Sequence, residues 1–479
     1  MDDYEIQYDG QYQSILDQFL KFEINNDLFS LRINDILIWE RIRQGVFKQI
    51  LVEKGLEQKN SVASTEGVAT YFKTFCQWSK SFYSKNPFYL NSSDFLFIGT
   101  SRRKLREDGK WWDIICDPIL DTINLEYIYA EPPFRHSHQK PPKTDNIQYL
   151  DFITYTSAVQ RKLGIVKYEI PEREKQLIHE IESNLNTDFD VEIDFGKKIS
   201  EEIQKRSSEK WLYERLLKKI DPNIVVIVAN ISKQTFIESC KELDVPVVEL
   251  QHGGFGPDHL GYSFPGDRYS STFPDYLFVF GQFWKESVDF PIADNHVYPV
   301  GYPYLEEERT KFETKKDGED ILFISQPTTG EYISKLASRF AERNGNFTTK
   351  YKLHPKEYHC WEEYYPWLKN SDIIVIDDDS TPLYKLLSQA QAQVGVNSTV
   401  LSEGLIFNLS TYIINAPGHE RLSHLIDQEV VSVISSVSDL ENELDKSKKN
   451  TELDIDYLFE PNPIENIEEA FEDIIKKHN

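Results

Sequence analysis

The stretch best suited to chemistry is Gln251-His252-Gly253-Gly254, which follows a largely apolar run at residues 245–250. Such a run, without alternation, is typical of a parallel strand covered on both faces. In open α/β sheets ligands bind beyond the carboxyl ends of the strands, so His252 is expected at a binding edge. Its imidazole is suited to act as a general base, although a histidine beside a glycine turn can also merely satisfy local backbone groups.

Three further polar groups follow predicted strands in the second half of the chain. They are Gln326-Pro327 after residues 321–325, His354-Pro355 after residues 348–353, and Ser398-Thr399 after residues 392–396. Because the carboxyl ends of parallel strands share one edge of a sheet, we expect these groups to converge there.

The chemistry of this edge suits a phosphate. Hydroxyls of Ser398 and Thr399 at a helix amino terminus, together with free backbone N–H groups, form a ready anion site. His354 can donate a hydrogen bond to the same phosphate, and Glu403, one turn into the helix, is placed for ribose hydroxyls. The alternatives are that Ser398 or Thr399 only caps the helix and that Glu403 is an ordinary helix-start acid.

A basic turn at residues 100–106 follows another predicted strand, at residues 94–99. Its Arg102 and Arg103 are suited to bind an anionic group of an acceptor or donor, and a surface charge cluster is an equally good interpretation.

The elements that must position these residues alternate between strands and helices in both halves of the chain. Expected strands are residues 94–99, 123–130, 223–229, 245–250 and 276–281, then 321–325, 348–353, 372–377, 392–396 and 410–415. Strands that alternate with helices predict βαβ units with right-handed crossovers and a parallel sheet. The expected fold class is therefore α/β, with two Rossmann-like domains facing a cleft and an added helical N-terminal region.

At 479 residues the chain exceeds what one hydrophobic core usually organises. We expect a helical N-terminal region at residues 1–92, a first α/β domain at 93–300 with a helical insertion at 157–220, a second α/β domain at 301–460, and a C-terminal helix at 461–479. The charged segment 306–320 is expected to link the two domains.

Composition narrows the function further. With 79 acidic and 53 basic residues, the net charge of -26 argues against a nucleic-acid-binding surface. The four cysteines lack metal-ligand spacing, which favours reduced thiols in the cytosol and no metal site.

No signal sequence or membrane span is expected. An amphipathic helix at residues 36–52 is expected to pack against the first domain or to attach to a membrane surface or partner.

Taken together, the Gln-His-Gly of residues 251–253, the Lys-Leu-His-Pro of residues 352–355 and the Ser-Thr strand end resemble GT-B glycosyltransferases of surface-polysaccharide synthesis. The similar groups are capsular sialyl- and Kdo-transferases, which use CMP-sugars, and CDP-glycerol glycerophosphotransferases. The resemblance spans about residues 220–420. It implies that His354, Pro355, Ser398 and Thr399 bind the donor phosphate, that Gln326-Pro327 is the corresponding QP motif, and that His252 is a base.

The resemblance implies a metal-independent transferase without a cofactor, which moves a sugar from a nucleotide-activated donor to a saccharide or lipid-linked acceptor. Gln251 and Gly253 would contribute to the donor site. Asp113 or Asp117 would stand for the amino-domain acidic base of the sialyltransferases. The alternatives are glycerophosphate transfer, nucleotide-sugar 2-epimerisation, and a non-catalytic polysaccharide assembly protein. The expected location is the cytoplasm, with peripheral association at the inner face of the membrane.

Overall fold

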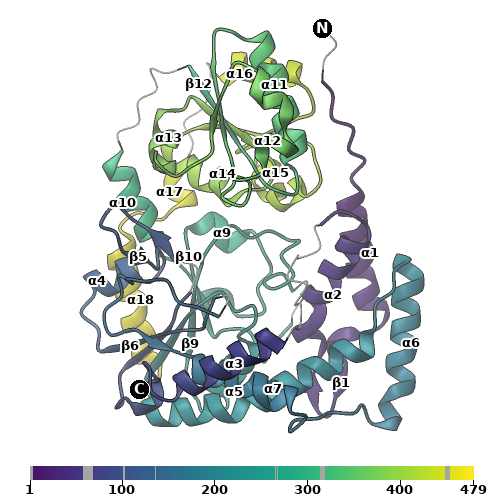
Figure 1. Ribbon diagram of the computed structural model, residues 1–479, viewed down its shortest axis with the longest axis vertical. Helices are drawn as coiled ribbons and strands as arrows, with labels where there is room; N and C mark the ends of the chain where they lie inside the picture. Colours follow the sequence, from purple (N-terminus) through teal and green to yellow (C-terminus); the bar gives the residue numbers. More distant parts are fainter. Residues whose placement is uncertain are drawn as a thin grey trace.

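The computed structural model describes residues 4–57, 68–100, 103–134, 136–264, 266, 268–312, 319–447 and 454–478. It consists of two lobes, each built on a parallel β-sheet (Figure 1). The lower lobe in this view holds a seven-stranded sheet and the N-terminal helices, and the upper lobe holds a six-stranded sheet.

All seven strands of the first sheet run parallel, in the order β11-β10-β9-β8-β3-β6-β7. They are β3 (Phe95–Ile98), β6 (Tyr127–Glu131), β7 (Gln148–Tyr149), β8 (Ile224–Val228), β9 (Val247–Leu250), β10 (Tyr276–Val279) and β11 (Val297–Pro299). The order reverses between β3 and β8, which makes this pair the topological switch point of the sheet.

The second sheet is also parallel throughout, in the order β14-β13-β12-β15-β16-β17. Its strands are β12 (Asp320–Ile324), β13 (Thr348–Lys352), β14 (Ile373–Ile376), β15 (Ala392–Gly395), β16 (Ser410–Ile414) and β17 (Ser432–Ile434). Its switch point lies between β12 and β15. Both sheets thus have the doubly wound Rossmann-like order, which confirms the expected fold class.

Helices cover both sheets and connect their strands. In the first lobe they are α1 (Gln11–Asn25), α2 (Trp39–Glu53), α3 (Val68–Ser81), α4 (Asp117–Thr122), α5 (Asp151–Lys162), α6 (Glu172–Phe189), α7 (Phe195–Ile220), α8 (Gln234–Lys241) and α9 (Gln282–Glu286). The later helices are α10 (Pro303–Lys311), α11 (Gly330–Arg343), α12 (Trp361–Tyr364), α13 (Leu383–Gln389), α14 (Thr399–Gly404), α15 (Ser423–Asp427), α16 (Val437–Ser447), α17 (Ile455–Leu458) and α18 (Pro463–His478). Two antiparallel hairpins, β1 (Arg32–Ile33) with β2 (Ile36–Leu37) and β4 (Lys104–Leu105) with β5 (Trp111–Trp112), complete the fold.

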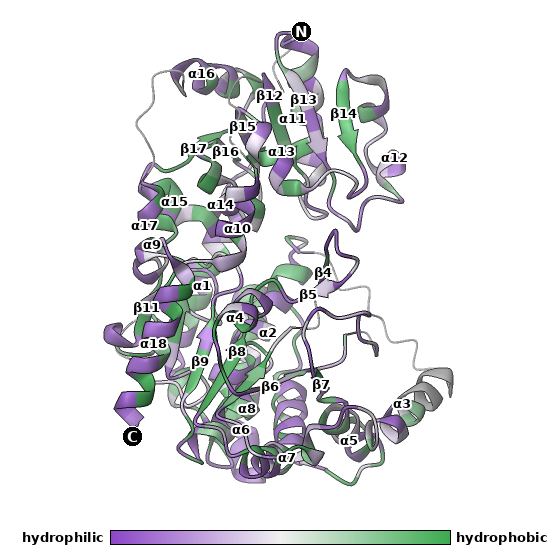
Figure 2. Cartoon of the chain, turned by 90° about the vertical axis from the view of Figure 1, so that its left-hand side faces the viewer, coloured by the Kyte–Doolittle hydropathy of each residue, from purple (hydrophilic) through white to green (hydrophobic). Residues whose placement is uncertain are grey.

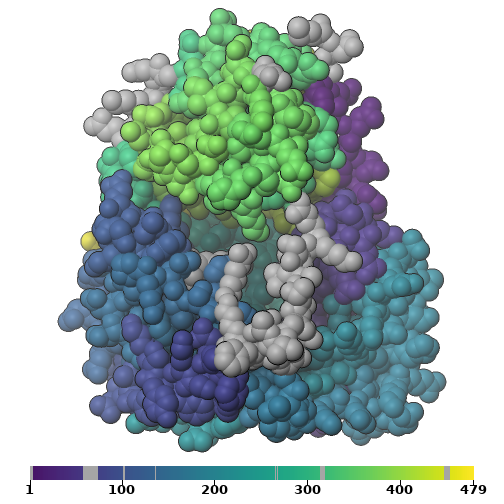
Figure 3. Space-filling view, viewed as in Figure 1, coloured from purple at the N-terminus to yellow at the C-terminus, as the bar shows by residue number. Residues whose placement is uncertain are grey.

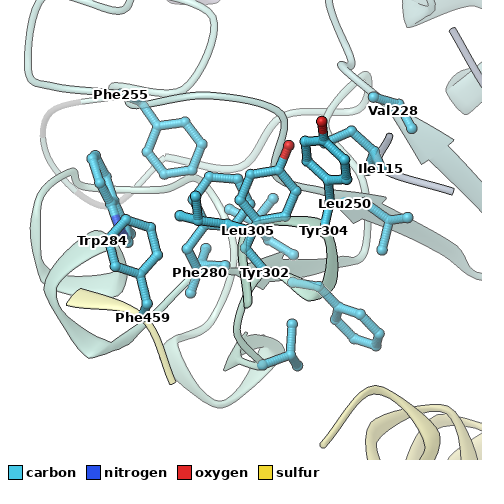
Figure 4. Close-up of a cluster of buried hydrophobic side chains, with 14 of the residues drawn as sticks. Ile115, Val228, Leu250, Phe255, Phe280, Trp284, Tyr302, Tyr304, Leu305 and Phe459 are labelled. Carbon is cyan, nitrogen blue, oxygen red and sulfur yellow. The ribbon is translucent and has the colours of Figure 1, made fainter. Parts of the chain in front are cut away.

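The central strands are buried over most of their length, as their largely apolar sequences predict. Every residue of β8 and β9 is buried, and the strands are mostly hydrophobic in Figure 2. One core cluster continues from the first lobe into the second. Figure 4 shows part of it, where Phe280 and Trp284 lie close to Phe459 and the ring of Tyr302 stacks on that of Phe280.

The N-terminal helices form a separate core with α6 and α7. Helix α2 supplies the amphipathic pattern expected at residues 36–52, and its apolar face packs inside this core. Its Arg43 does not face solvent as the pattern suggests. The guanidinium is buried and binds the carboxylate of Glu23 in α1 through two hydrogen bonds, of 2.7 and 2.9 Å.

The chain passes between the lobes at three places (Figure 1). Near the N-terminus, Glu5 pairs with Ser436 of the upper lobe, and the chain then enters α1. Helix α10 leads from the lower lobe toward β12. After α16, α17 and α18 return to the lower lobe, where Phe471 packs on Phe95 and Phe278 with ring centroids 5.2 Å apart in both pairs.

Several elements differ from those expected. The strand expected at residues 123–130 starts only at Tyr127. The first part of the segment expected to be a linker, residues 306–311, belongs to helix α10, where Glu308 is buried. The short strands β7, β11 and β17 lie at or next to sheet edges and are two or three residues long, so their sequence pattern is too brief to identify them. In the part of the chain that the structure describes, no helix combines the length and apolar character needed to cross a bilayer.

Candidate functional site

The upper lobe brings Gln326 and the strand end at Asn397 together at its switch point. The side-chain amide of Gln326 donates to Asn397 Oδ1 at 2.5 Å, and the backbone N–H of Asn397 donates to Gln326 Oε1 at 3.0 Å. Asn397 Nδ2 also donates to the carbonyl oxygen of Gly418, at 2.9 Å. Gln326 therefore ties β12 to β15 where ligands bind in doubly wound sheets. Pro327, which follows it, is half-buried.

His354 follows β13, and its protonation state can be read from its contacts. The backbone N–H of Lys356 donates to His354 Nδ1 at 3.1 Å, so in the neutral ring the proton lies on Nε2. Burial lowers the pKa of His354 from its usual value, which keeps the ring neutral at pH 7. The half-buried His354 can therefore offer an Nε2–H hydrogen bond to a ligand, and the neighbouring Pro355 is exposed.

Ser398 and Thr399 begin the short helix α14. Ser398 caps it, accepting a hydrogen bond from the backbone N–H of Val400 at 3.3 Å. Capping uses an oxygen lone pair and leaves the hydroxyl proton of Ser398 able to donate. Thr399 is exposed. The helix has six residues, so the hydroxyls rather than a long helix dipole are the groups that this strand end can offer.

The turn at residues 251–254 in the lower lobe meets this strand end. A Cβ added to Gly253 would lie 3.3 Å from Thr399 Cγ2, which places the turn against the start of α14. His252 is exposed, with its ring centroid 6.5 Å from that of Tyr262. The turn carrying His252 and the strand end carrying Ser398 and Thr399 therefore come from different lobes and touch. Figure 3 shows a hollow between the lobes in this region of the molecule.

Gln251 has a different place from the one expected. It is buried, accepts a hydrogen bond from the backbone N–H of Phe280 at 2.7 Å, and donates to the carbonyl oxygen of Gly253 at 2.8 Å. Both polar ends of its amide are thus engaged within the lower lobe. Gln251 fixes the turn that carries His252, and its contribution to a donor site stays a prediction.

Glu403 is half-buried, and its carboxylate has a partner within the upper lobe. It accepts a hydrogen bond from the hydroxyl of Tyr384 at 2.7 Å, and burial raises its pKa. Lys104, from the β4–β5 hairpin of the other lobe, stands over the ring of Tyr384 at 4.8 Å and counteracts this rise in pKa. Glu403 thus takes part in a contact between the lobes.

Arg103, Asp113 and Asp117 were expected to meet an acceptor or anion, and the structure buries all three. Arg103 forms ion pairs with Glu131 at 2.8 Å and with Asp117 at 3.5 Å. Asp113 accepts hydrogen bonds from Tyr129 and from the backbone N–H groups of residues 100, 115 and 116. Burial raises the pKa of Asp117 to about 7. We therefore assign these residues to the interior of the first lobe. Arg102 lies outside the described residues.

A second contact between the lobes, around Arg421, was not predicted from any sequence pattern. The guanidinium of Arg421 lies 3.3 Å from Asp258 and 2.9 Å from Glu57, and Tyr12 donates to Asp258 at 2.7 Å. The four residues come from segments far apart in the chain and share no motif, so only the fold reveals them. Over the described ranges, no cluster of histidine, cysteine or acidic side chains has the arrangement of a metal site.

Comparison with protein-family models finds no match, and no curated protein matches the sequence. Among solved structures, the UDP-GlcNAc 2-epimerase of Methanocaldococcus jannaschii is 12% identical with a TM-score of 0.45, over 80% of this chain and 99% of that one. A calicheamicin glycosyltransferase is 11% identical with a TM-score of 0.41, over 81% and 96% of the two chains. A wall teichoic acid polymerase, TagF, is 11% identical with a TM-score of 0.41, over 91% and 99%.

Proposed function

We propose that this protein is a GT-B-type glycosyltransferase that moves a sugar from a nucleotide-activated donor, with a CMP-sugar favoured, to a surface-polysaccharide or glycolipid acceptor. The observation that carries the proposal is the contact of the His252 turn with the strand end that bears Ser398 and Thr399. A base on one lobe and phosphate-binding groups on the other are what such a transfer requires. A cytoplasmic location at the inner face of the membrane is part of the same proposal.

In the proposed reaction the acceptor hydroxyl oxygen bonds to the anomeric carbon, and the bond from that carbon to the nucleotide phosphate oxygen breaks. His252 takes the acceptor proton, and the nucleotide leaves with the bonding electrons. General base catalysis of this kind typically contributes about 10²- to 10⁴-fold. His252 is exposed at the interlobe turn, where it can be reached by an acceptor.

The leaving phosphate would be stabilised by His354, Ser398 and Thr399. The Nε2–H of His354 is left to donate because Nδ1 accepts from Lys356, and the Ser398 hydroxyl can donate while it caps α14. Prepositioned donors that face a developing negative charge can each contribute about 10²- to 10³-fold to the rate. We propose that these groups suffice without a metal ion or a cofactor.

The decisive variant is His354→Ala, with His359→Ala as its control. His359 is an exposed histidine five positions further along the same segment. We expect His354→Ala to lower donor hydrolysis and transfer by at least about 10²-fold, with an unchanged circular dichroism spectrum, and His359→Ala to keep wild-type activity. Wild-type rates in His354→Ala would refute the phosphate assignment.

A screen of CMP-, CDP-, UDP- and GDP-activated donors tests the reaction class. A sugar transferred from a CMP-sugar to added acceptor supports the proposal. Transfer of glycerophosphate from CDP-glycerol would instead support a glycerophosphotransferase. An isomerised sugar formed from the donor alone would indicate an epimerase, and binding without turnover of any donor would indicate a polysaccharide assembly protein.

A further inference from the structure

Glu357 is a buried acidic residue at the end of the turn that begins with His354. It lies in the upper lobe between β13 and α12, and it is 2% exposed. A buried carboxylate is costly to keep in a fold unless its oxygens are hydrogen-bonded. Both oxygens of Glu357 accept hydrogen bonds, and the first of these bonds comes from His354.

This first bond closes the turn on itself. The backbone N–H of His354 donates to Glu357 Oε2 at 2.9 Å, and the backbone N–H of Glu357 donates to the carbonyl oxygen of His354 at 2.8 Å. The reciprocal pair fixes both ends of the turn. Between these ends, the N–H of Lys356 donates to His354 Nδ1 at 3.1 Å. The backbone that Glu357 holds is therefore the backbone that sets the tautomer of the His354 ring.

The second bond ties Glu357 to the rest of the upper lobe. The hydroxyl of Tyr365, itself buried, donates to Glu357 Oε1 at 2.6 Å. Gly330, the first residue of α11, packs directly on this pair, because a Cβ added there would overlap the hydroxyl of Tyr365 and lie 2.9 Å from Glu357 Oε1. Helix α11 follows the strand end that carries Gln326. Glu357 thus joins the supports of two strand ends assigned to the donor phosphate.

The charges near His354 give Glu357 a second effect on the ring. Burial lowers the pKa of His354, the negative charge of Glu357 raises it, and the positive charges of Lys356 and Lys352 lower it. Among these three charged neighbours, only Glu357 favours the protonated ring. Removal of its charge should therefore change the pKa of His354 even where the turn keeps its shape.

We propose that Glu357 is a positioning residue for His354, whose carboxylate holds residues 354–357 in the geometry that occupies Nδ1 and directs Nε2–H at the donor phosphate. The inference rests on the proposed function, in which His354 binds that phosphate. Glu357 is buried and reaches the reaction only through the tautomer and orientation of the His354 ring.

Three variants separate the parts of this support. Glu357→Gln keeps an oxygen that can accept the N–H of His354 but removes the negative charge, and Glu357→Ala removes both. Tyr365→Phe removes only the hydroxyl that donates to Glu357. The matched controls are Glu363→Gln and Glu363→Ala, because Glu363 is exposed in α12, six positions further along the same segment.

The first readout is the His354 ring in the full chain without a ligand. Long-range ¹H–¹⁵N NMR reports which ring nitrogen carries the proton, a pH titration gives the pKa, and His354→Gln identifies the signals. We expect the wild type to carry the proton on Nε2. Glu357→Gln should keep this tautomer with a lower pKa of His354, because the favourable charge is gone. Glu357→Ala should give a mixture of tautomers, and the Glu363 variants should match the wild type.

The second readout is hydrolysis of a CMP-activated sugar at pH 7. We expect Glu357→Ala to lower the rate roughly 10²-fold, because misplacement of a catalytic group by about 1 Å has a cost of this order, and Glu357→Gln to lower it less than about 10-fold. The Glu363 variants should keep the wild-type rate. A Glu357 that only stabilises the fold would lower the midpoint of thermal unfolding and leave the tautomer unchanged.

An unchanged tautomer or a wild-type rate in Glu357→Ala would overturn the inference. Should Glu357→Ala fail to fold, Glu357→Gln decides, since a wild-type pKa of His354 in that variant would also overturn it. A wild-type protein that turns over no nucleotide donor would refute the proposed function, whereas the NMR comparison would still show whether Glu357 sets the His354 ring. Donor turnover with an unchanged tautomer in Glu357→Ala would refute only the positioning role.

Discussion

The ion pair of Arg43 and Glu23 shows how single residues hold the N-terminal helices in place. Arg43 is 1% exposed and Glu23 is 2% exposed. Arg43 also donates to the carbonyl oxygens of Leu260 and Ser263, at 2.8 and 2.7 Å, in a segment that lines a cavity of about 640 Å³ between the lobes. One guanidinium thus joins α1, α2 and the cavity wall.

We predict that Arg43→Met lowers the free energy of unfolding by about 3–5 kcal/mol, because it leaves the carboxylate of Glu23 buried without a counter-charge. Denaturant unfolding measures the change. The double variant Glu23→Leu/Arg43→Met, which removes both charges, should recover much of the loss. A loss below about 1 kcal/mol in the single variant would show that Glu23 gains water or another partner.

His259, in the same cavity wall, links stability to pH. Burial lowers its pKa to about 4, and the positive charge of nearby Arg421 acts in the same direction. The unfolded chain binds this proton near pH 6.5, whereas the folded chain binds it only near pH 4. The contribution of neutral His259 to the free energy of unfolding is therefore fully present above pH 6.5 and is lost as the pH falls toward 4.

We predict that wild type loses up to about 3 kcal/mol relative to His259→Gln between pH 7 and pH 4. Denaturant unfolding of both proteins across this range gives the difference between their free energies of unfolding. The other titrating groups are the same in both proteins, so their effects cancel in this difference. Glu249, whose pKa burial raises to about 7, acts in the opposite direction and is common to both proteins. Parallel stability curves for the two proteins would contradict the prediction.

For single residues, the sequence predicted which types lie at strand ends. It did not predict which of these side chains already make hydrogen bonds inside the protein. His354 and Thr399 stand at half-buried or exposed strand ends, as their positions after expected strands predict. Gln251 also follows an expected strand, yet it is buried and its side chain makes hydrogen bonds within the lobe, as does Asp113, which the resemblance implied as a base. Partners such as Phe280 and Tyr129 come from other strands, so spacing along the chain cannot reveal them.

Among the elements, α18 depends on a close backbone approach. Gly301 has a φ of 90°, and a Cβ added there would overlap the carbonyl oxygen of Glu460 and lie 2.7 Å from Pro463 Cβ. The lack of a side chain therefore lets the start of α18 dock beside β11.

We predict that Gly301→Ala lowers the free energy of unfolding by at least about 2 kcal/mol, from the positive φ and the steric overlap together. The matched control is Gly109→Ala, where φ is 73° and a Cβ meets nothing within 4 Å. The control should lose only about 1–2 kcal/mol. Equal losses would mean that the close approach of residues 460–463 relaxes freely.

Elements with long apolar runs were predictable, and short or mixed ones were not. The strands β8, β9 and β15 lie within their expected ranges, and β12 starts one residue before its range, because burial on both faces favours largely apolar sequences. We did not predict helix α10, because its many charged residues are typical of a linker. Its Tyr304 and Leu305 are nevertheless buried in the core that the two lobes share.

For the whole molecule, the continuous hydrophobic core is the feature with the largest consequence. Leu305, Leu387 and Leu401 belong to the same buried cluster as Phe278 of the first sheet. The lobes therefore share apolar surface that neither could expose alone without a large cost in free energy.

We predict that differential scanning calorimetry shows one unfolding transition for the wild-type protein, because the shared core couples both lobes. Leu305→Ala should lower the midpoint, since a buried leucine replaced by alanine typically costs about 2–5 kcal/mol. Two resolved transitions in the wild type would show that the lobes unfold independently.

Because the chain passes between the lobes at three places, cleavage of one passage should not separate the lobes. A protease that cleaves between residues 312 and 319 severs only the direct path from α10 to β12. The fragment 1–312 still reaches the upper lobe through Glu5 and Ser436, and the remaining fragment still reaches the lower lobe through Phe471. The two pieces should stay together and copurify, so the chain lends itself to expression as two halves that reassemble.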